Sequence, residues 1–176
     1  MKYIEAPGTL STEAAEFLDP IPVPRLDPAE YELQLQDLFP FGAYLPAYGQ
    51  VTYLFGSTAE ERLRAATTIA GLNNLFLLRV DLRGLAAPDV EGFEARIAMI
   101  LREAHRLQAA FLLHEIDPVI TMSPEVVRDE LLDWSAMLPA VFCTGEEPFA
   151  QELPAVGGRF RRMAVGGEGD PSRQVF

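Results

Sequence analysis

Several kinds of residue are scarce in this sequence of 176 residues. Its single cysteine, Cys143, excludes an internal disulfide and is compatible with a reducing compartment. No apolar run approaches the roughly 18 to 20 residues that cross a bilayer. The start, MKYIEAPGTL, lacks an apolar block followed by a small-residue cleavage site, which argues against secretion. We therefore expect a cytoplasmic domain with no membrane contact.

Lysine is almost absent from the chain. Lys2 is the only lysine, and every other basic residue is an arginine. Phosphate-binding loops use a lysine as a compact point charge beside the phosphate oxygens. Beyond the N-terminus, no lysine is available for that role.

Basic residues are also outnumbered, with 14 against 26 acidic residues and a net charge of −12. Half of this charge lies in residues 1–40, which hold eight acidic and two basic residues. Such a field repels phosphate backbones, so nucleic acid is not an expected partner. A protein partner with a basic surface is compatible with this acidic field.

Two parts of the chain differ in composition. Residues 1–40 are acidic and rich in proline, which predicts an extended or loosely packed arm with one helix from Asp27 and Pro28 to just before Pro40. Beyond them, apolar strands alternate with helices. The expected strands are 50–55, 75–82, 109–116, 140–145 and 159–165, and the expected helices are 58–72, 88–107 and 123–138.

Strands that are apolar throughout are typical of a sheet covered by helices on both faces. The pattern therefore predicts an α/β protein, a three-layer αβα sandwich with a mainly parallel five-stranded sheet. A flavodoxin-like fold shows the same alternation and remains an alternative.

Four motifs follow the predicted strands in a particular order. GSTAEERL follows the first strand, FLLHEID ends the third, CTGEEPF follows the fourth, and GGRFRRMAV spans the fifth. In order and spacing these motifs resemble the AAA+ ATPase core, a P-loop NTPase fold, over roughly residues 45–176. The resemblance is greatest to the diverged N-terminal AAA-like domain of some bacterial ATPases that carry a second, intact ATPase domain. It implies a core over residues 41–170 and the start of a missing lid helix at 171–176.

The first motif occupies the place of the family's phosphate loop. Gly56 matches the first glycine of that loop. Arg62 stands where the resemblance implies a lysine, and Glu61 and Leu63 stand where it implies a second glycine and a hydroxyl. Ser57 and Thr58 each begin a capping-box pattern with a glutamate three residues later, which favours a well-capped turn over a phosphate cradle.

The second and third motifs occupy the family's metal and sensor positions. His114 replaces the acid that holds Mg²⁺, and imidazole is a poor ligand for this hard cation. Glu115 matches the general base, as a relic or with weak activity, and Thr144 lies beside a glycine at the sensor position. We expect no metal site, and either no cofactor or weakly bound ATP or ADP with Mg²⁺ at Gly56, Ser57, Thr58, Arg62 and Thr144.

The fourth motif retains an arginine, Arg159, at the position that in AAA+ rings reaches a neighbouring subunit's nucleotide. The resemblance implies that Arg159 is donated to a partner's site, although a solvated basic edge explains it equally well. A zinc site formed by His105 and His114 is not expected, because no further ligand lies at the right spacing. Cys143 is expected to be a small core residue and not a nucleophile.

These features lead to a first hypothesis and two alternatives. The first is a degenerate AAA+ domain that does not hydrolyse ATP and acts as an interaction or regulatory module beside an active ATPase domain or subunit. The alternatives are a nucleotide-binding AAA+ ATPase with weak or retained hydrolysis, and an α/β interaction domain unrelated to nucleotides. The expected partner is a protein, in a homo-oligomer, a hetero-oligomer or a following ATPase domain.

Overall fold

The computed structural model describes residues 1–40, 49–85, 90–116, 129, 133–146 and 160–166. In these residues a six-stranded sheet has the order β1-β3-β4-β5-β2-β6. The five strands expected from the sequence are all present and run parallel: β2 (Val51–Phe55), β3 (Phe76–Val80), β4 (Ala109–Leu113), β5 (Val141–Gly145) and β6 (Phe160–Ala164). The predicted mainly parallel α/β sheet is therefore confirmed.

A sixth strand was not expected from the sequence. β1 (Leu18–Ile21) pairs antiparallel with β3 at the edge of the sheet. The N-terminal segment is thus more closely packed than the extended or loosely packed arm that its composition predicts. The reason is a small set of apolar side chains between the prolines and acids, and four of them are buried: Ile4, Ala14, Leu18 and Val23.

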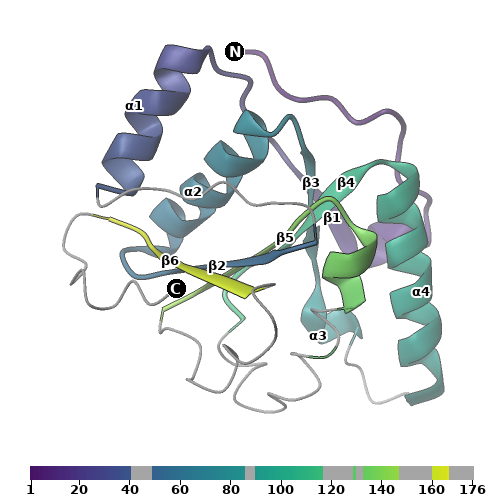
Figure 1. Cartoon of the computed structure of the whole chain (residues 1–176). Helices are drawn as coiled ribbons and strands as arrows, with labels where there is room; N and C mark the ends of the chain where they lie inside the picture. The colour runs from purple at the N-terminus through teal and green to yellow at the C-terminus, as the bar shows by residue number, and fades with distance from the viewer. Residues whose placement is uncertain (41–48, 86–89, 117–128, 130–132, 147–159, 167–176) are drawn as a thin grey trace.

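The helices form two layers on opposite faces of this sheet (Figure 1). α1 (Pro28–Leu38) and α2 (Ala59–Leu72) lie on one side, and α4 (Val90–Arg106) lies on the other. Short helices η1 (Ala14–Glu16) and α3 (Leu82–Leu85) flank the sheet, and residues 133–137 are helical. α1 starts where it was predicted, with a complete capping box between Asp27 and Glu30.

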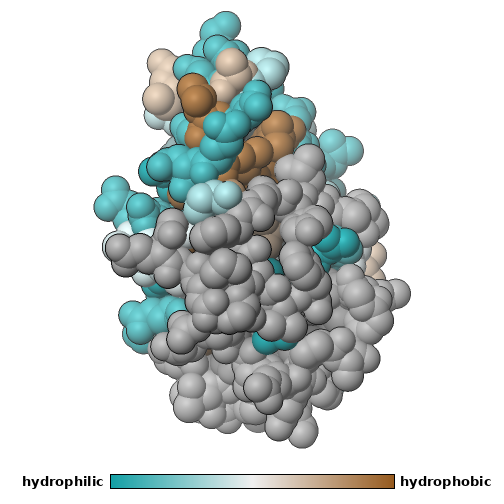
Figure 2. Space-filling view, turned by 60° about the vertical axis from the view of Figure 1, so that its left-hand side comes forward, coloured by the Kyte–Doolittle hydropathy of each residue, from teal (hydrophilic) through white to brown (hydrophobic). Residues whose placement is uncertain are grey.

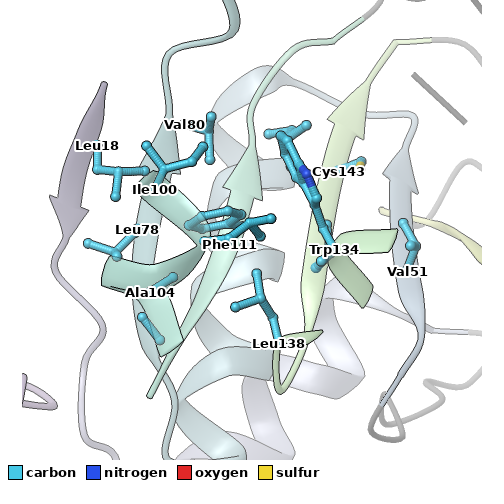
Figure 3. Packing of buried hydrophobic residues seen from close by; sticks show 14 of the residues in the cluster. Leu18, Val51, Leu78, Val80, Ile100, Ala104, Phe111, Trp134, Leu138 and Cys143 are labelled. Atoms are coloured by element: carbon cyan, nitrogen blue, oxygen red, sulfur yellow. The ribbon is translucent and has the colours of Figure 1, made fainter. Parts of the chain in front are cut away.

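Side chains that alternate along the strands supply one hydrophobic core on each face. In β2, for example, Tyr53 packs into the core beneath α4, while Leu54 packs into the core beneath α2. In the α4 core, Phe111 meets Trp134 edge to face, with 5.4 Å between the ring centroids (Figure 3). These two cores fix the strand order, and the strand order decides which loops lie side by side.

The side of the molecule formed by α1 and α2 is mixed in character. Figure 2 shows hydrophobic side chains in its upper part, bordered by hydrophilic ones. Leu33 on α1 is 66% exposed, and scattered exposed apolar side chains of this kind are normal on protein surfaces. Within the residues that the structure describes, no helix is long and apolar enough to cross a membrane.

Candidate functional site

The carboxyl ends of four neighbouring strands meet at one edge of the sheet. In register, Phe55 of β2 lies opposite Gly145 of β5 on one side and Ala164 of β6 on the other. β4 lies next to β5 and ends just before His114. Ligands of open parallel sheets bind outside the carboxyl ends of the strands. The loop after β2 and the residues after β4 therefore form the candidate site.

The loop after β2 has the backbone form of a tight strand-to-helix turn. Gly56 and Ser57 both have positive φ angles, 80° and 55°. Thr58 is the N-cap of α2, and its hydroxyl accepts a hydrogen bond from the Glu61 amide at 3.2 Å. Of the two capping patterns in the sequence, the structure therefore selects the one that starts at Thr58.

β6 closes the other side of this turn. The Val165 amide donates to the Phe55 carbonyl at 2.8 Å. Gly166 has a φ of 91°, and a Cβ atom there would lie 3.1 Å from the Ser57 side chain. The glycine is thus needed both for its backbone angle and for close approach. Sequence reasoning missed it, although the repeated glycines at 166 and 167 were a visible signal.

Arg62 lies beneath the turn and is nearly inaccessible, with 2% of its surface exposed. Its Nη1 donates to the carbonyl oxygens of Gly56 at 3.0 Å and Ser57 at 2.9 Å. Its Nε and Nη2 donate to the two carboxylate oxygens of Glu115, at 2.9 and 2.8 Å. This bidentate geometry is the one that a guanidinium provides and an ammonium does not. The turn is held by an arginine from inside, and not by the glutamates at its helix start alone.

Glu115, like Gly56 and Ser57, has a positive φ angle. Its value of 57° is uncommon for a residue other than glycine. Burial by itself raises the pKa of its carboxyl group, but the hydrogen bonds and charge of Arg62 outweigh burial and lower that pKa below its ordinary value. His114 and Thr144 contribute in the same direction. Glu115 is therefore an ionised carboxylate whose two oxygens are already committed to Arg62.

Thr144 links the ends of β4 and β5. Its hydroxyl oxygen accepts from the Glu115 amide at 2.8 Å, and it lies 2.7 Å from His114 Nδ1 and 3.2 Å from a Glu115 carboxylate oxygen. The single hydroxyl proton can be donated to either of the last two groups. Thr144 is fully buried, which suits a link between strands.

His114 occupies the position where the resemblance implies a metal-binding acid. Burial lowers the pKa of its imidazole, the Glu115 carboxylate opposes this, and the charges of Arg79 and Arg62 add to the lowering. The neutral ring is therefore favoured near pH 7. His114 and Glu115 also border a cavity of about 580 Å³, whose other walls include Arg79, Arg83 and residues 15–19.

These groups do not fit the magnesium nucleotide that the fold implies. The carboxylate that would act on water is paired with Arg62, the acid that would hold Mg²⁺ is an imidazole, and two loop carbonyls face the guanidinium. Among the described residues, no group of three or more His, Cys, Asp or Glu side chains is arranged to hold a metal. We therefore derive no catalytic step through Mg²⁺ or a nucleotide.

Most of the residues singled out from the sequence come together in this cluster: Gly56, Ser57, Thr58, Arg62, His114, Glu115 and Thr144. Arg159 lies outside the described residues, as do the predicted lid start at 171–176 and the N-terminal part of the 123–138 helix. His105 is on α4 and away from His114 at the end of β4. Cys143 is buried in β5, where burial raises the pKa of its thiol, as expected for a core residue.

Comparison with known proteins gives a fold but no close relative. No protein-family model matches the sequence, and no curated protein matches it at a significant level. Solved structures that match include one described as the structural basis for katanin self-assembly, with 14% sequence identity and a TM-score of 0.53, covering 92% of this chain and 61% of that one. The FIGL-1 AAA domain in complex with ADP matches with 19% identity and a TM-score of 0.52, over 86% of this chain and 58% of that one.

A further structure of the FIGL-1 AAA domain matches with 13% identity and a TM-score of 0.52. This chain thus spans about three fifths of the length of these solved structures. At such identities the likeness concerns the arrangement of helices and strands, and it agrees with the resemblance carried by the four motifs. The core of this chain has the AAA+ ATPase-like, P-loop NTPase fold.

Proposed function

We propose that this chain is a degenerate AAA+ domain that does not hydrolyse ATP and serves as an interaction or regulatory module. One observation carries the proposal: Arg62 and Glu115, at the positions of the family's phosphate-binding lysine and general base, form a bidentate ion pair with each other. In the proposed state each group is the other's partner, so neither is available to a nucleotide.

The surroundings of the pair support this proposal. A phosphate that displaced Glu115 from Arg62 would leave that carboxylate partly buried beside the phosphate's own negative charge. It would also meet Glu60 and Glu61 in the first turn of α2, where a phosphate site depends on unopposed backbone N–H groups. The energetic cost of opening the pair therefore counts against binding.

The expected partner is an active ATPase domain, following in the same chain or on another subunit, in the cytoplasm. Arg159 belongs to this part of the proposal, as the arginine that would reach the partner's nucleotide. Replacing Arg159 with alanine tests it: the partner's rate of ATP hydrolysis should fall while this chain's own stability stays the same.

Calorimetric titration of the chain with millimolar Mg·ATP and Mg·ADP, followed by an assay of phosphate release, tests the main proposal. We expect no saturable binding and no release above buffer. The matched variants are Glu115→Gln, which breaks the ion pair, and Glu60→Gln, which removes an exposed charge nearby. Circular dichroism should first establish that each variant is folded at the assay temperature.

Two outcomes would contradict the proposal to different extents. Micromolar binding with turnover that Glu115→Gln abolishes would show an active ATPase. Binding without turnover would make the domain a nucleotide sensor, in which Arg62 exchanges Glu115 for a phosphate.

A further inference from the structure

The outer surface of α4 carries a groove that plays no part in the strand-end site. Its volume is about 780 Å³, and it lies between α4 and the helical residues 133–137. The α4 residues that line it recur every three or four positions and so form one continuous stripe along the helix: Glu94, Ile97, Ala98, Leu101, Arg102 and His105. Ala136 and Met137 line the opposite wall.

The centre of this groove is apolar. Ile97 and Leu101 form its floor, since they are only 8% and 7% exposed. Ala98 is exposed, and the Met137 side chain is 49% exposed on the rim. A small residue at the middle of a helix face allows another helix to approach closely. The groove therefore has the shape and polarity of a helix-docking surface.

The two ends of the stripe have opposite charges. Glu94 lies toward the start of α4 and Arg102 toward its end, and within the part of the chain that the structure describes neither side chain has a hydrogen bond or ion pair. They are eight residues apart, which is about 12 Å along a helix. Ala98 is the residue midway between them.

This arrangement is complementary to itself. If a second α4 lies antiparallel across the first with a two-fold axis at Ala98, each Glu94 faces the other copy's Arg102, and the two small Ala98 side chains meet on the axis. Isologous contacts of this kind, in which one patch binds the same patch on another copy, are the commonest way in which soluble proteins dimerise. Charge complementarity fixes the direction and register of such a contact.

We propose that the α4 groove, defined by the stripe from Glu94 to His105 with Ala136 and Met137, binds the α4 of a second copy of this chain in an antiparallel two-fold dimer. The dimer does not rest on the proposed loss of ATP hydrolysis, because its residues lie on the opposite side of the sheet from α2 (Figure 1). It leaves the strand-end edge of the domain available to an ATPase partner.

Charge reversal tests both the surface and its symmetry. Sedimentation equilibrium over a wide range of protein concentration should show a monomer–dimer equilibrium for the unmodified chain. Glu94→Arg and Arg102→Glu should each raise the dimer dissociation constant at least about tenfold, because each places like charges at two symmetric contacts. An equimolar mixture of the two variants should dimerise as the unmodified chain does, since every contact then pairs opposite charges.

The double variant E94R/R102E should also dimerise, because it swaps both signs at once. Ala98→Glu should weaken the dimer by bringing two carboxylates together on the axis, while it keeps a residue that favours helix. Glu32→Arg on α1 is the matched control, an exposed charge reversal on the other side of the molecule, and should change nothing. Circular dichroism and urea unfolding would show that every variant folds.

Several results would overturn the proposal. An unmodified chain that stays monomeric at all concentrations would exclude the dimer. Association that the single reversals leave unchanged would place the contact elsewhere. A mixture of the two variants that dimerises no better than either alone would exclude the antiparallel register about Ala98.

Discussion

The turn after β2 and the outer face of α4 both carry charged side chains, but these charges find their partners in different places. At the turn, Arg62 is buried and all of its donor groups are directed at Glu115 or at carbonyl oxygens of the same chain. On α4, Glu94 and Arg102 border an apolar groove and lack partners among the described residues. At the turn, folding pairs the polar groups of Arg62 and Glu115 with each other. On α4, the charges of Glu94 and Arg102 are exposed and suited to an interaction with another molecule.

The difference between paired charges at the turn and exposed charges on α4 indicates that the two regions have different roles. The bidentate contact between Arg62 and Glu115 holds the end of β4 against α2, and removing either partner would leave the other without its counter-charge. The floor of the α4 groove, Ile97 and Leu101, also belongs to the hydrophobic core. The exposed charges at the ends of the groove, which have no partners among the described residues, contribute little to folding and are suited to association.

Replacing Arg62 with methionine should have the largest effect on stability. Methionine fills a similar volume but leaves the Glu115 carboxylate and two carbonyl groups without their donors, so the free energy of unfolding should fall by about 3 kcal/mol. Urea unfolding measures this loss. The R62M/E115Q double variant should lose clearly less than the sum of the two single losses, because the charges act as a pair. Additive losses would show that Arg62 and Glu115 are independent and would remove the basis of the contrast.

Replacing Gly166 with alanine tests the packing of β6 against the same turn. The new Cβ atom would lie 3.1 Å from the Ser57 side chain, on a backbone with a φ of 91°. A non-glycine residue in this region costs about 1 to 2 kcal/mol, and thermal unfolding should show the loss. Gly8, which has no positive φ, is the matched control, and G8A should cost less. Equal losses would mean that the turn is not closed by β6.

Stability should depend on pH through His114. Its pKa is lowered in the folded chain, so below the ordinary value of 6.5 the unfolded chain binds a proton that the folded chain does not. Stability should therefore fall as the pH decreases from 6.5 toward the lowered pKa, and then level off. His114→Asn should flatten this part of a urea-midpoint profile.

Glu115 provides an internal reference for that profile. Its lowered pKa stabilises the fold above its ordinary value of 4.5, and this contribution is lost only as the pH falls through the lowered pKa. The loss of stability through His114 therefore begins at a higher pH than the loss through Glu115. A profile that is the same in the unmodified chain and in His114→Asn would show that the His114 imidazole is not the group that titrates.

Replacing Arg102 with glutamine should have the smallest effect on the folded monomer. An exposed residue without a partner changes the free energy of unfolding by no more than about 0.5 kcal/mol. The dimer should nevertheless weaken, and added salt should weaken the unmodified dimer in the same way. Urea unfolding at low protein concentration, combined with sedimentation, separates the two effects. A large loss of monomer stability would show that Arg102 makes stabilising contacts within its own chain, as Arg62 does, and would contradict the difference between the two regions.

Much of the local structure follows from local patterns in the sequence. Five apolar strands and the helices between them were predicted because the spacing of apolar residues reports which side of each element is buried. The start of α1 followed from Asp27 and Pro28, and the capped start of α2 from Thr58 and Glu61. β1 was missed because a four-residue edge strand containing Pro20 carries almost no pattern of its own.

The sequence by itself determined that the phosphate-loop position lacks a lysine, that an imidazole replaces an acid at His114, and that the chain builds an α/β sheet. It did not show that Arg62 and Glu115 bind each other, because they are 53 residues apart and meet only when β4 is brought near β2 across β5. Strand order depends on how two hydrophobic cores pack, and that is a property of the whole chain. Tertiary structure therefore decided that Arg62 holds the turn through hydrogen bonds from beneath, and that Glu94 and Arg102 of α4 are exposed at the surface.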